Sequence, residues 1–98
     1  EAPVVGKLPT GDEINGRVDR LVVTPAEILV IDYKTDRPAP PTVKGVGEAY
    51  IAQMAAYRHV LSQLWPSRLV RCLLVWTDGP QLMEIPSEML DGALSRLR

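Results

Sequence analysis

The first half of the chain carries short apolar runs separated by turn residues, a pattern typical of β-strands. Residues 3–8 form a brief apolar run, and residues 14–23 and 28–35 are rich in Val and Ile, which favour strands. Pro9–Asp12 and Thr24–Glu27 have the composition of turns. We therefore expect a short edge strand, followed by a β-hairpin in which residues 14–23 pair with residues 28–35.

The second half changes to a helical period. Residues 48–64 place apolar side chains at the spacing of one helical face, and Pro66 is expected to stop the helix. The residues of that face are Tyr50, Met54, Tyr57, Leu61 and Leu64. Residues 69–77 predict a mostly buried strand, residues 81–85 a short partner strand, and a final helix of about ten residues is expected from Ser87.

A segment rich in proline and glycine joins the two halves. Residues 36–47 contain three prolines and two glycines, so we expect a long loop with no regular element, either a cover over a substrate or a simple connection. Strands interrupted by one crossover helix predict an α/β or α+β fold, with a central mixed sheet, a β-hairpin and packed helices. The length of 98 residues allows one domain.

Composition removes several classes of function. Eleven basic residues against twelve acidic ones give a net charge of −1, which argues against recognition through a large basic field. An acidic site that holds a metal remains possible. The single cysteine, Cys72, excludes a disulfide framework and a cysteine-rich zinc module, and it is compatible with a reducing compartment. No apolar run has the length of a membrane span, so we expect no membrane partner.

Two acids of the predicted hairpin are expected to face each other. If the turn is centred between Pro25 and Ala26, Asp19 lies directly opposite Asp32, and opposed residues share a face with Cβ atoms about 4.5–5.5 Å apart. Two carboxylates that close repel each other, and a divalent cation such as Mg²⁺ would resolve the conflict. The prediction depends on register, because a slip by one residue would put the two acids on opposite faces.

Lys34 adds a cation beside these acids, because residues two apart in a strand share a side. Next to a metal and a phosphate, a lysine can orient a water or neutralise charge that builds on phosphorus. The alternative for the bare triplet of Asp32 and Lys34 is an exposed ion pair on an edge strand. The buried run of residues 28–31 that leads into Asp32, and the second acid in register, favour metal-assisted phosphodiester hydrolysis.

Three motifs also resemble a known family in order and spacing. G-R-V-D-R (16–20), V-I-D-Y-K-T (30–35) and Y-I-A-Q-M-A-A-Y (50–57) are similar to those of PD-(D/E)XK nucleases of the RecB type. The likeness is greatest to the C-terminal nuclease domain of AddA, the helicase–nuclease subunit of bacterial AddAB complexes, and E-A-P-V (1–4) resembles the segment before the hairpin there. The resemblance covers nearly the whole chain and implies a restriction-endonuclease-like core.

The resemblance assigns roles to individual residues. It implies that Asp19 and Asp32 bind the metal together with the backbone carbonyl of Tyr33, and that Lys34 is the catalytic lysine. The metal would be Mg²⁺, with Mn²⁺ as a substitute, and the reaction would be hydrolysis of DNA. A further group is expected to organise the site or contact the DNA. Its members are Gln53 and Tyr57, the Q-x-x-x-Y signature, together with Arg20.

The resemblance also implies a larger context. Residues 1–98 would be the nuclease domain at the C-terminal end of a helicase–nuclease, with the helicase part in the same chain, an AddB-type partner subunit and DNA as partners. The location would be the bacterial cytoplasm at the nucleoid. The family's first helix, with a histidine of the metal shell, has no counterpart in this sequence, and His59 lies on a different element.

Two alternatives stay open. One is a stand-alone RecB-like or Cas4-like nuclease, although Cas4-like members carry a cysteine set for an iron–sulfur cluster that Cys72 alone cannot supply. The other is a degenerate nuclease fold that serves as a DNA-binding or subunit-docking module. Cys72 and Trp76 are interpreted as core residues, and His59 as a surface residue of its helix.

Overall fold

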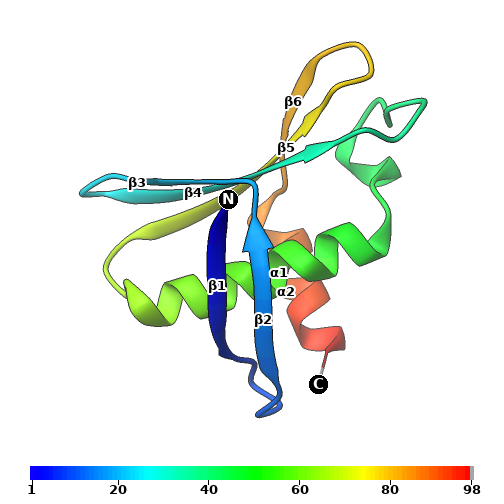
Figure 1. Ribbon diagram of the computed structural model, residues 1–98. Coiled ribbons are helices and arrows are strands. Elements are labelled where there is room, and N and C mark those ends of the chain that lie inside the picture. Colours follow the sequence, from blue (N-terminus) through cyan, green and yellow to red (C-terminus); the bar gives the residue numbers. More distant parts are fainter. Residues whose placement is uncertain (98) are drawn as a thin grey trace.

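The computed structural model describes residues 1–97 and contains six strands and two α-helices. The order of elements agrees with the sequence prediction, except that the predicted strand of residues 14–23 is divided into two (Figure 1). The elements are β1 (Ala2–Lys7), β2 (Glu13–Val18), β3 (Arg20–Val23), β4 (Glu27–Lys34), the 3₁₀ turn η1 (Val43–Gly45), α1 (Glu48–Leu64), β5 (Leu69–Trp76), β6 (Gln81–Glu84) and α2 (Ser87–Arg96).

Four of the strands form a mixed sheet in the order β3-β4-β5-β6. The central strands β4 and β5 are parallel, with Asp32 opposite Leu74 and Lys34 opposite Trp76, whereas β3 and β6 run antiparallel to their neighbours. The crossover between the parallel strands is α1, and both helices lie on one side of the sheet (Figure 1). The predicted mixed sheet with packed helices is therefore confirmed.

The prediction of one hairpin from residues 14–23 and 28–35 is wrong in its first arm. The run is divided at Asp19: β2 pairs with β1 in a separate two-stranded sheet, and only β3 pairs with β4. Figure 1 shows the chain turning a corner between β2 and β3. The physical reason is that Asp19 leaves the ladder and uses its own N–H and carboxylate to bind β4.

The register predicted for β3 and β4 is confirmed. Arg20 pairs with Ile31, and Val23 pairs with Ile28. The turn that sets this register is closed by Thr24, whose N–H donates to the carbonyl of Glu27 at 2.9 Å, and whose hydroxyl accepts the N–H of Glu27 at 2.9 Å. Because side chains alternate along a strand, this register decides which residues reach the helix side of the sheet.

Helix α1 follows the predicted bounds, with one error in its buried face. Met54, Tyr57 and Leu61 are buried, but Leu64 is 60% exposed because the helix ends there and the chain turns through Trp65 towards β5. Alanines in the middle of α1 allow the helix to lie close to the sheet. The hydrophobic core lies between this helix and the sheet. Its most buried members include Ile28, Val30, Met54, Val60, Cys72, Leu74, Trp76, Ile85 and Leu90.

The loop of residues 36–47 is more ordered than its composition predicts. It contains the 3₁₀ turn η1, in which Gly45 and Val46 donate to the carbonyls of Thr42 and Val43 at 3.1 Å. Val46 is buried and belongs to the core. The expectation of a segment without any regular element was therefore wrong, because a buried apolar side chain fixes the end of the loop against α1 and α2.

Candidate active site at the end of strand β4

A buried aspartate and a lysine lie at the C-terminal end of strand β4. The strand alternates Ile28, Val30, Asp32 and Lys34 towards the helix side, so the apolar run places the two charged residues at the edge of the core. Asp32 is 5% exposed and is the one buried charged residue of the described part of the chain. The Lys34 ammonium lies 3.5 Å from Oδ2 of Asp32, which offsets part of the cost of burying that carboxylate.

Asp19 brings a second carboxylate to the same place. In a regular hairpin, the N–H of Tyr33 would donate to the main chain of the opposite strand. Here it donates to Oδ2 of Asp19 at 2.8 Å, while the N–H of Asp19 donates to Oδ1 of Asp32 at 3.0 Å. Each aspartate therefore holds the backbone next to the other one. This reciprocal arrangement, which we call the aspartate clasp (Asp19 and Asp32), puts the two side chains together beside Lys34.

An aromatic ring covers Lys34 on its other side. The ammonium lies 3.9 Å from the centre of the Tyr50 ring, within the range of a cation–π interaction. The Tyr50 hydroxyl donates to Asp36 at 2.9 Å, and this contact raises the pKa of Tyr50, because a phenolate would face the carboxylate. The ring of Tyr50 in turn packs at 6.4 Å from that of Trp76, which is buried. Lys34 is thus held between a carboxylate and an aromatic ring.

Tyr57 and Gln53 approach the clasp from α1. The hydroxyl of Tyr57 accepts a hydrogen bond from Gln53 at 3.2 Å and donates to the carbonyl of Arg17 at 3.4 Å. Burial raises the pKa of Tyr57; the Gln53 hydrogen bond lowers it, and the negative charges of Asp32 and Asp19 raise it again. The bond to the Arg17 carbonyl places the hydroxyl two residues from Asp19 along the chain.

Gly16 makes room for this hydroxyl. A Cβ added at Gly16 would lie 2.5 Å from Oη of Tyr57, closer than a side chain tolerates. The glycine in β2 is therefore needed for the close approach of β2 to α1. The motif of residues 16–20 and the motif of residues 50–57 meet in space at this contact.

A comparison of the sequence with protein families decides what this arrangement belongs to. The sequence model of the PD-(D/E)XK nuclease superfamily matches residues 3–85, which cover β1 to β6 and include every residue of the site. The chain belongs to the PD-(D/E)XK nuclease superfamily. No curated protein sequence matches the chain significantly.

The fold agrees with this family. A crystal structure of a "Putative exonuclease" from Eubacterium rectale matches with a TM-score of 0.69 and 17% sequence identity. The match covers 98% of this chain and 40% of the other, so the chain spans less than half the length of that protein. The similarity supports the restriction-endonuclease-like fold and extends to the helices as well as the sheet.

Members of this superfamily generally depend on a divalent metal, and the donor set here consists of carboxylate oxygens. The described residues contain no group of three or more His, Cys, Asp or Glu side chains that could hold a metal. A site with only Asp19 and Asp32 suits Mg²⁺, which is typically held by one or two carboxylates with water and phosphate oxygens as the other ligands. The carbonyl of Tyr33 lies on the same side of β4 as its N–H, which faces Asp19.

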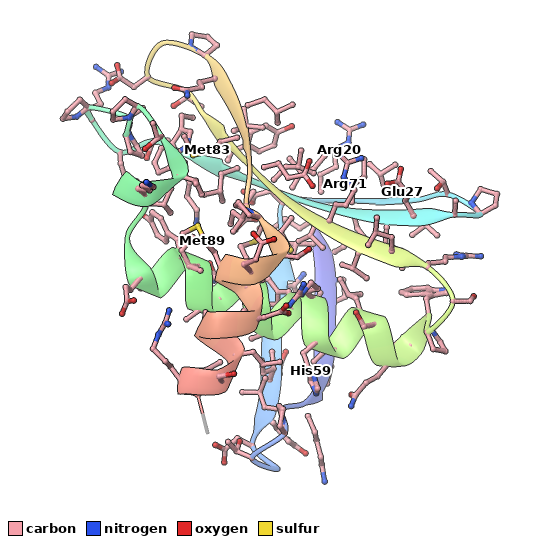
Figure 2. All side chains as sticks on the ribbon, turned by 180° about the vertical axis from the view of Figure 1, so that it is seen from behind. Arg20, Glu27, His59, Arg71, Met83 and Met89 are labelled. Carbon is pink, nitrogen blue, oxygen red and sulfur yellow. The ribbon has the colours of Figure 1, made fainter. Side chains whose placement is uncertain are left out.

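The structure brings together most of the PD-(D/E)XK residues that the sequence predicted, with one exception. Asp19, Asp32, Lys34, Gln53 and Tyr57 all gather at the end of β4. Arg20 pairs with Ile31, and its side chain lies on the side of the sheet away from the helices, the side that also carries Arg71 and Glu27 (Figure 2). It makes no contact with the clasp.

Other residues lie where the sequence placed them. His59 points away from the sheet on α1, on the far side from Arg20 (Figure 2). Cys72 is fully buried, and burial raises the pKa of its thiol to about 12, so it is a core residue and no nucleophile. Neither helix of the described residues has the length and the apolar character needed to cross a bilayer.

Two residues of the site were not predicted from the sequence. Tyr50 was assigned only to the apolar helical face, and Asp36 only to the loop, yet the Tyr50 ring covers Lys34 and Asp36 accepts the hydrogen bond of the Tyr50 hydroxyl. A signal was present in both cases. Asp36 continues the alternation of Asp32 and Lys34 by two further positions, and Tyr50 lies one helical turn before Gln53.

Proposed function

We propose that the chain hydrolyses phosphodiester bonds of DNA in the presence of Mg²⁺, as an exonuclease. The observation that carries this proposal is the aspartate clasp beside Lys34. The Asp32 carboxylate accepts the N–H of Asp19, and the Asp19 carboxylate accepts the N–H of Tyr33, so both carboxylates are fixed before any ligand arrives and their geometry requires little reorganisation. The printed name of the Eubacterium rectale structure, an exonuclease, points the same way.

Each residue then has a role in the reaction. Asp19 and Asp32 would hold the cation, with the Tyr33 carbonyl as a further oxygen ligand, and the cation would supply Lewis-acid chemistry at the scissile phosphate. Lys34, fixed by Asp32 and Tyr50, orients the attacking water and neutralises charge that develops on phosphorus. Gln53 and Tyr57 border the site from α1 and position the DNA strand.

We also propose a place for this nuclease in a larger machine. The order of the motifs at 16–20, 30–35 and 50–57 resembles that of AddA, so the chain would work with an ATP-dependent helicase part, an AddB-type subunit and DNA in double-strand-break resection. ATP-dependent shortening of linear duplex DNA by the complete polypeptide and its partner subunit would support this context. Cleavage that is independent of ATP would favour a stand-alone nuclease.

The cleavage reaction is tested with the complete polypeptide, a 5′-labelled single-stranded oligonucleotide, and Mg²⁺ or Mn²⁺. We expect products with the metal and none with excess chelator. Asp32→Asn keeps the size of the side chain and an acceptor for the Asp19 N–H, but it removes the charge that binds a cation. We expect a loss of cleavage of about 100-fold or more, because a preorganised charged group is removed.

The matched control removes an acid of the same sheet on its other face. Glu84→Gln changes a partly exposed carboxylate that pairs with Arg71, far from the clasp, and should cleave at the parent rate. Mn²⁺ affinity is measured on the same three proteins by calorimetry. Unchanged cleavage in Asp32→Asn would overturn the proposal. If the parent shows no Mn²⁺ binding that is lost in Asp32→Asn, the result would instead indicate a docking module.

A further inference from the structure

A pocket of about 500 Å³ lies between the proline-rich loop and the start of α1. The loop contributes Pro38, Pro40 and Pro41, and the two aromatic residues Tyr50 and Trp76 complete the wall. Its volume is in the range of sites for small organic ligands, and its lining is mostly apolar. None of the roles proposed above uses this pocket.

The pocket begins one side chain beyond the catalytic lysine. Tyr50 covers Lys34 with its ring and also lines the pocket, and Asp36, which accepts the hydrogen bond from Tyr50, is part of the same wall. A molecule bound at the aspartate clasp and a molecule bound in the pocket would therefore lie on the two sides of Tyr50. Within one nucleotide the base is joined to the phosphate through the sugar, so the two positions correspond in kind to the two ends of a nucleotide.

The loop that forms the wall is fixed to the rest of the fold. The N–H of Ala39 donates to Asp78 at 3.1 Å, and the side chain of Gln81 donates to the carbonyl of Pro41 at 3.5 Å. Both partners belong to the β5–β6 hairpin and its turn, on the far side of the pocket from α1. The pocket is therefore preformed, which lowers the entropic cost of binding a ligand.

The charge of the wall selects among ligands. Asp36 is the one charged residue among those that line the pocket, and its carboxylate would repel a phosphate. A nucleobase is neutral and flat, stacks on aromatic and proline surfaces, and can donate an exocyclic amino group to a carboxylate. Apolar walls with a single anionic acceptor suit that chemistry.

We propose that this pocket binds one nucleobase of the DNA strand whose phosphate lies at the aspartate clasp, with preference for bases that carry an amino group. The proposal rests on the nuclease function proposed above and deepens it, because it adds a contact with a base to a site otherwise built for phosphate and metal. Such a contact would fix the register of the strand at the site of cleavage.

The test fills the pocket without touching the clasp. Gly47 lines the pocket, its backbone angles (φ −59°, ψ 141°) suit any residue, and a Cβ there would meet no heavy atom within 4 Å. Gly47→Phe should therefore fold and occupy the pocket. Ala49→Phe, at an exposed position of the same wall, is a second variant. Gln63→Phe adds the same ring to an exposed position at the other end of α1 as the matched control.

The first measurement needs neither metal nor cleavage. Deoxycytidine, deoxyadenosine, thymidine and deoxyribose 5-phosphate are titrated into the complete polypeptide by NMR. We expect the amino-bearing nucleosides to bind more tightly than thymidine and the base-free sugar phosphate not to bind, and we expect Gly47→Phe and Ala49→Phe, but not Gln63→Phe, to weaken nucleoside binding about tenfold or more.

The second measurement uses cleavage of oligonucleotides with one abasic position. In the parent protein, one position relative to the cut should slow cleavage when its base is missing, and Gly47→Phe should abolish that difference. Equal nucleoside binding by Gly47→Phe and the parent would overturn the pocket proposal even where DNA is cleaved. Nucleoside binding that depends on Gly47 in a protein without cleavage would keep the pocket and overturn the nuclease function.

Discussion

The two faces of the four-stranded sheet are built from alternate residues of the same strands, yet they have little else in common. On the helix side, Asp32 and Lys34 lie among buried side chains, and each of these two side chains has a partner at a defined distance. On the outer side, the polar side chains form an exposed network in which Arg71 binds Glu84 and Glu27. Figure 2 shows Arg71 and Glu27 on the side of the sheet away from the helices.

The difference teaches where chemistry can be placed in this fold. A carboxylate that is 5% exposed has little contact with bulk water, so its contacts are few, fixed and directional. An ion pair on the outer face is screened by solvent and adds little to stability or to the position of its neighbours. We therefore expect substitutions on the helix side to have large and specific effects, and the same kinds of substitution on the outer face to have small ones.

The largest effect is expected for Lys34. Lys34→Met keeps the length of the side chain against the Tyr50 ring but removes the charge next to Asp32. Because a positioned positive group is lost from the reaction, cleavage of single-stranded DNA in Mg²⁺ should fall by about 100-fold or more. Circular dichroism should show an intact fold. A variant that cleaves within threefold of the parent would remove Lys34 from the proposed mechanism.

The second effect concerns packing under the site. Gly16→Ala would place a Cβ 2.5 Å from the Tyr57 hydroxyl, and overpacking of this kind costs about 1–3 kcal/mol of the free energy of unfolding. Urea denaturation measures it. Tyr57→Phe removes the atom that the new Cβ meets first, so the double variant should recover part of the loss made by Gly16→Ala. A double variant that loses the sum of the two single effects would show that the contact is unimportant.

A smaller effect is expected for Tyr50, which touches Lys34 without touching the clasp. Tyr50→Leu removes the ring above the ammonium and should lower cleavage about tenfold, since an exposed cation–π contact contributes on the order of 1 kcal/mol to holding a side chain in place. Tyr50→Phe keeps the ring, loses only the hydrogen bond to Asp36, and should stay closer to the parent. Equal rates for both variants would mean that the ring does not position Lys34.

Local chemistry explains how much of this could be predicted. The register of Asp19 and Asp32 followed from Thr24–Glu27, because a short turn fixes which residues of a hairpin are opposed. The division of residues 14–23 into two strands did not follow, because Val18 and residues 21–23 beside Asp19 favour a strand and the contact with Asp32 is a tertiary one. The periodicity of apolar residues can place a residue on one face of a strand. It cannot show where a side chain takes the place of a main-chain hydrogen-bond partner between two strands.

The pairing of distant elements was also beyond the sequence. Tyr50 and Lys34 meet because α1 crosses over the parallel strands β4 and β5, a geometry that depends on the whole sheet. The sequence predicted Tyr50 only as a residue of the apolar face of its helix. That placement was right, but it did not show the contact of Tyr50 with Lys34. Arg20 shows the opposite error: it is next to Asp19 in the sequence and on the other face of the sheet in space.

The smallest effect is expected on the outer face, where it also depends on pH. The hydrogen bonds from Arg71, opposed by slight burial, lower the pKa of Glu84. A carboxyl group with a lowered pKa in the folded state stabilises the fold above the ordinary pKa range of glutamate and loses that contribution as the pH falls through the folded value. Glu84→Gln should therefore be slightly less stable than the parent near pH 7, and the difference should vanish in acid.

Urea denaturation at several pH values measures this difference in the free energy of unfolding, and the loss at neutral pH should stay below that of Gly16→Ala. A difference that persists at low pH, or a change in DNA cleavage, would mean that the outer face is coupled to the site and that the contrast between the two faces is wrong.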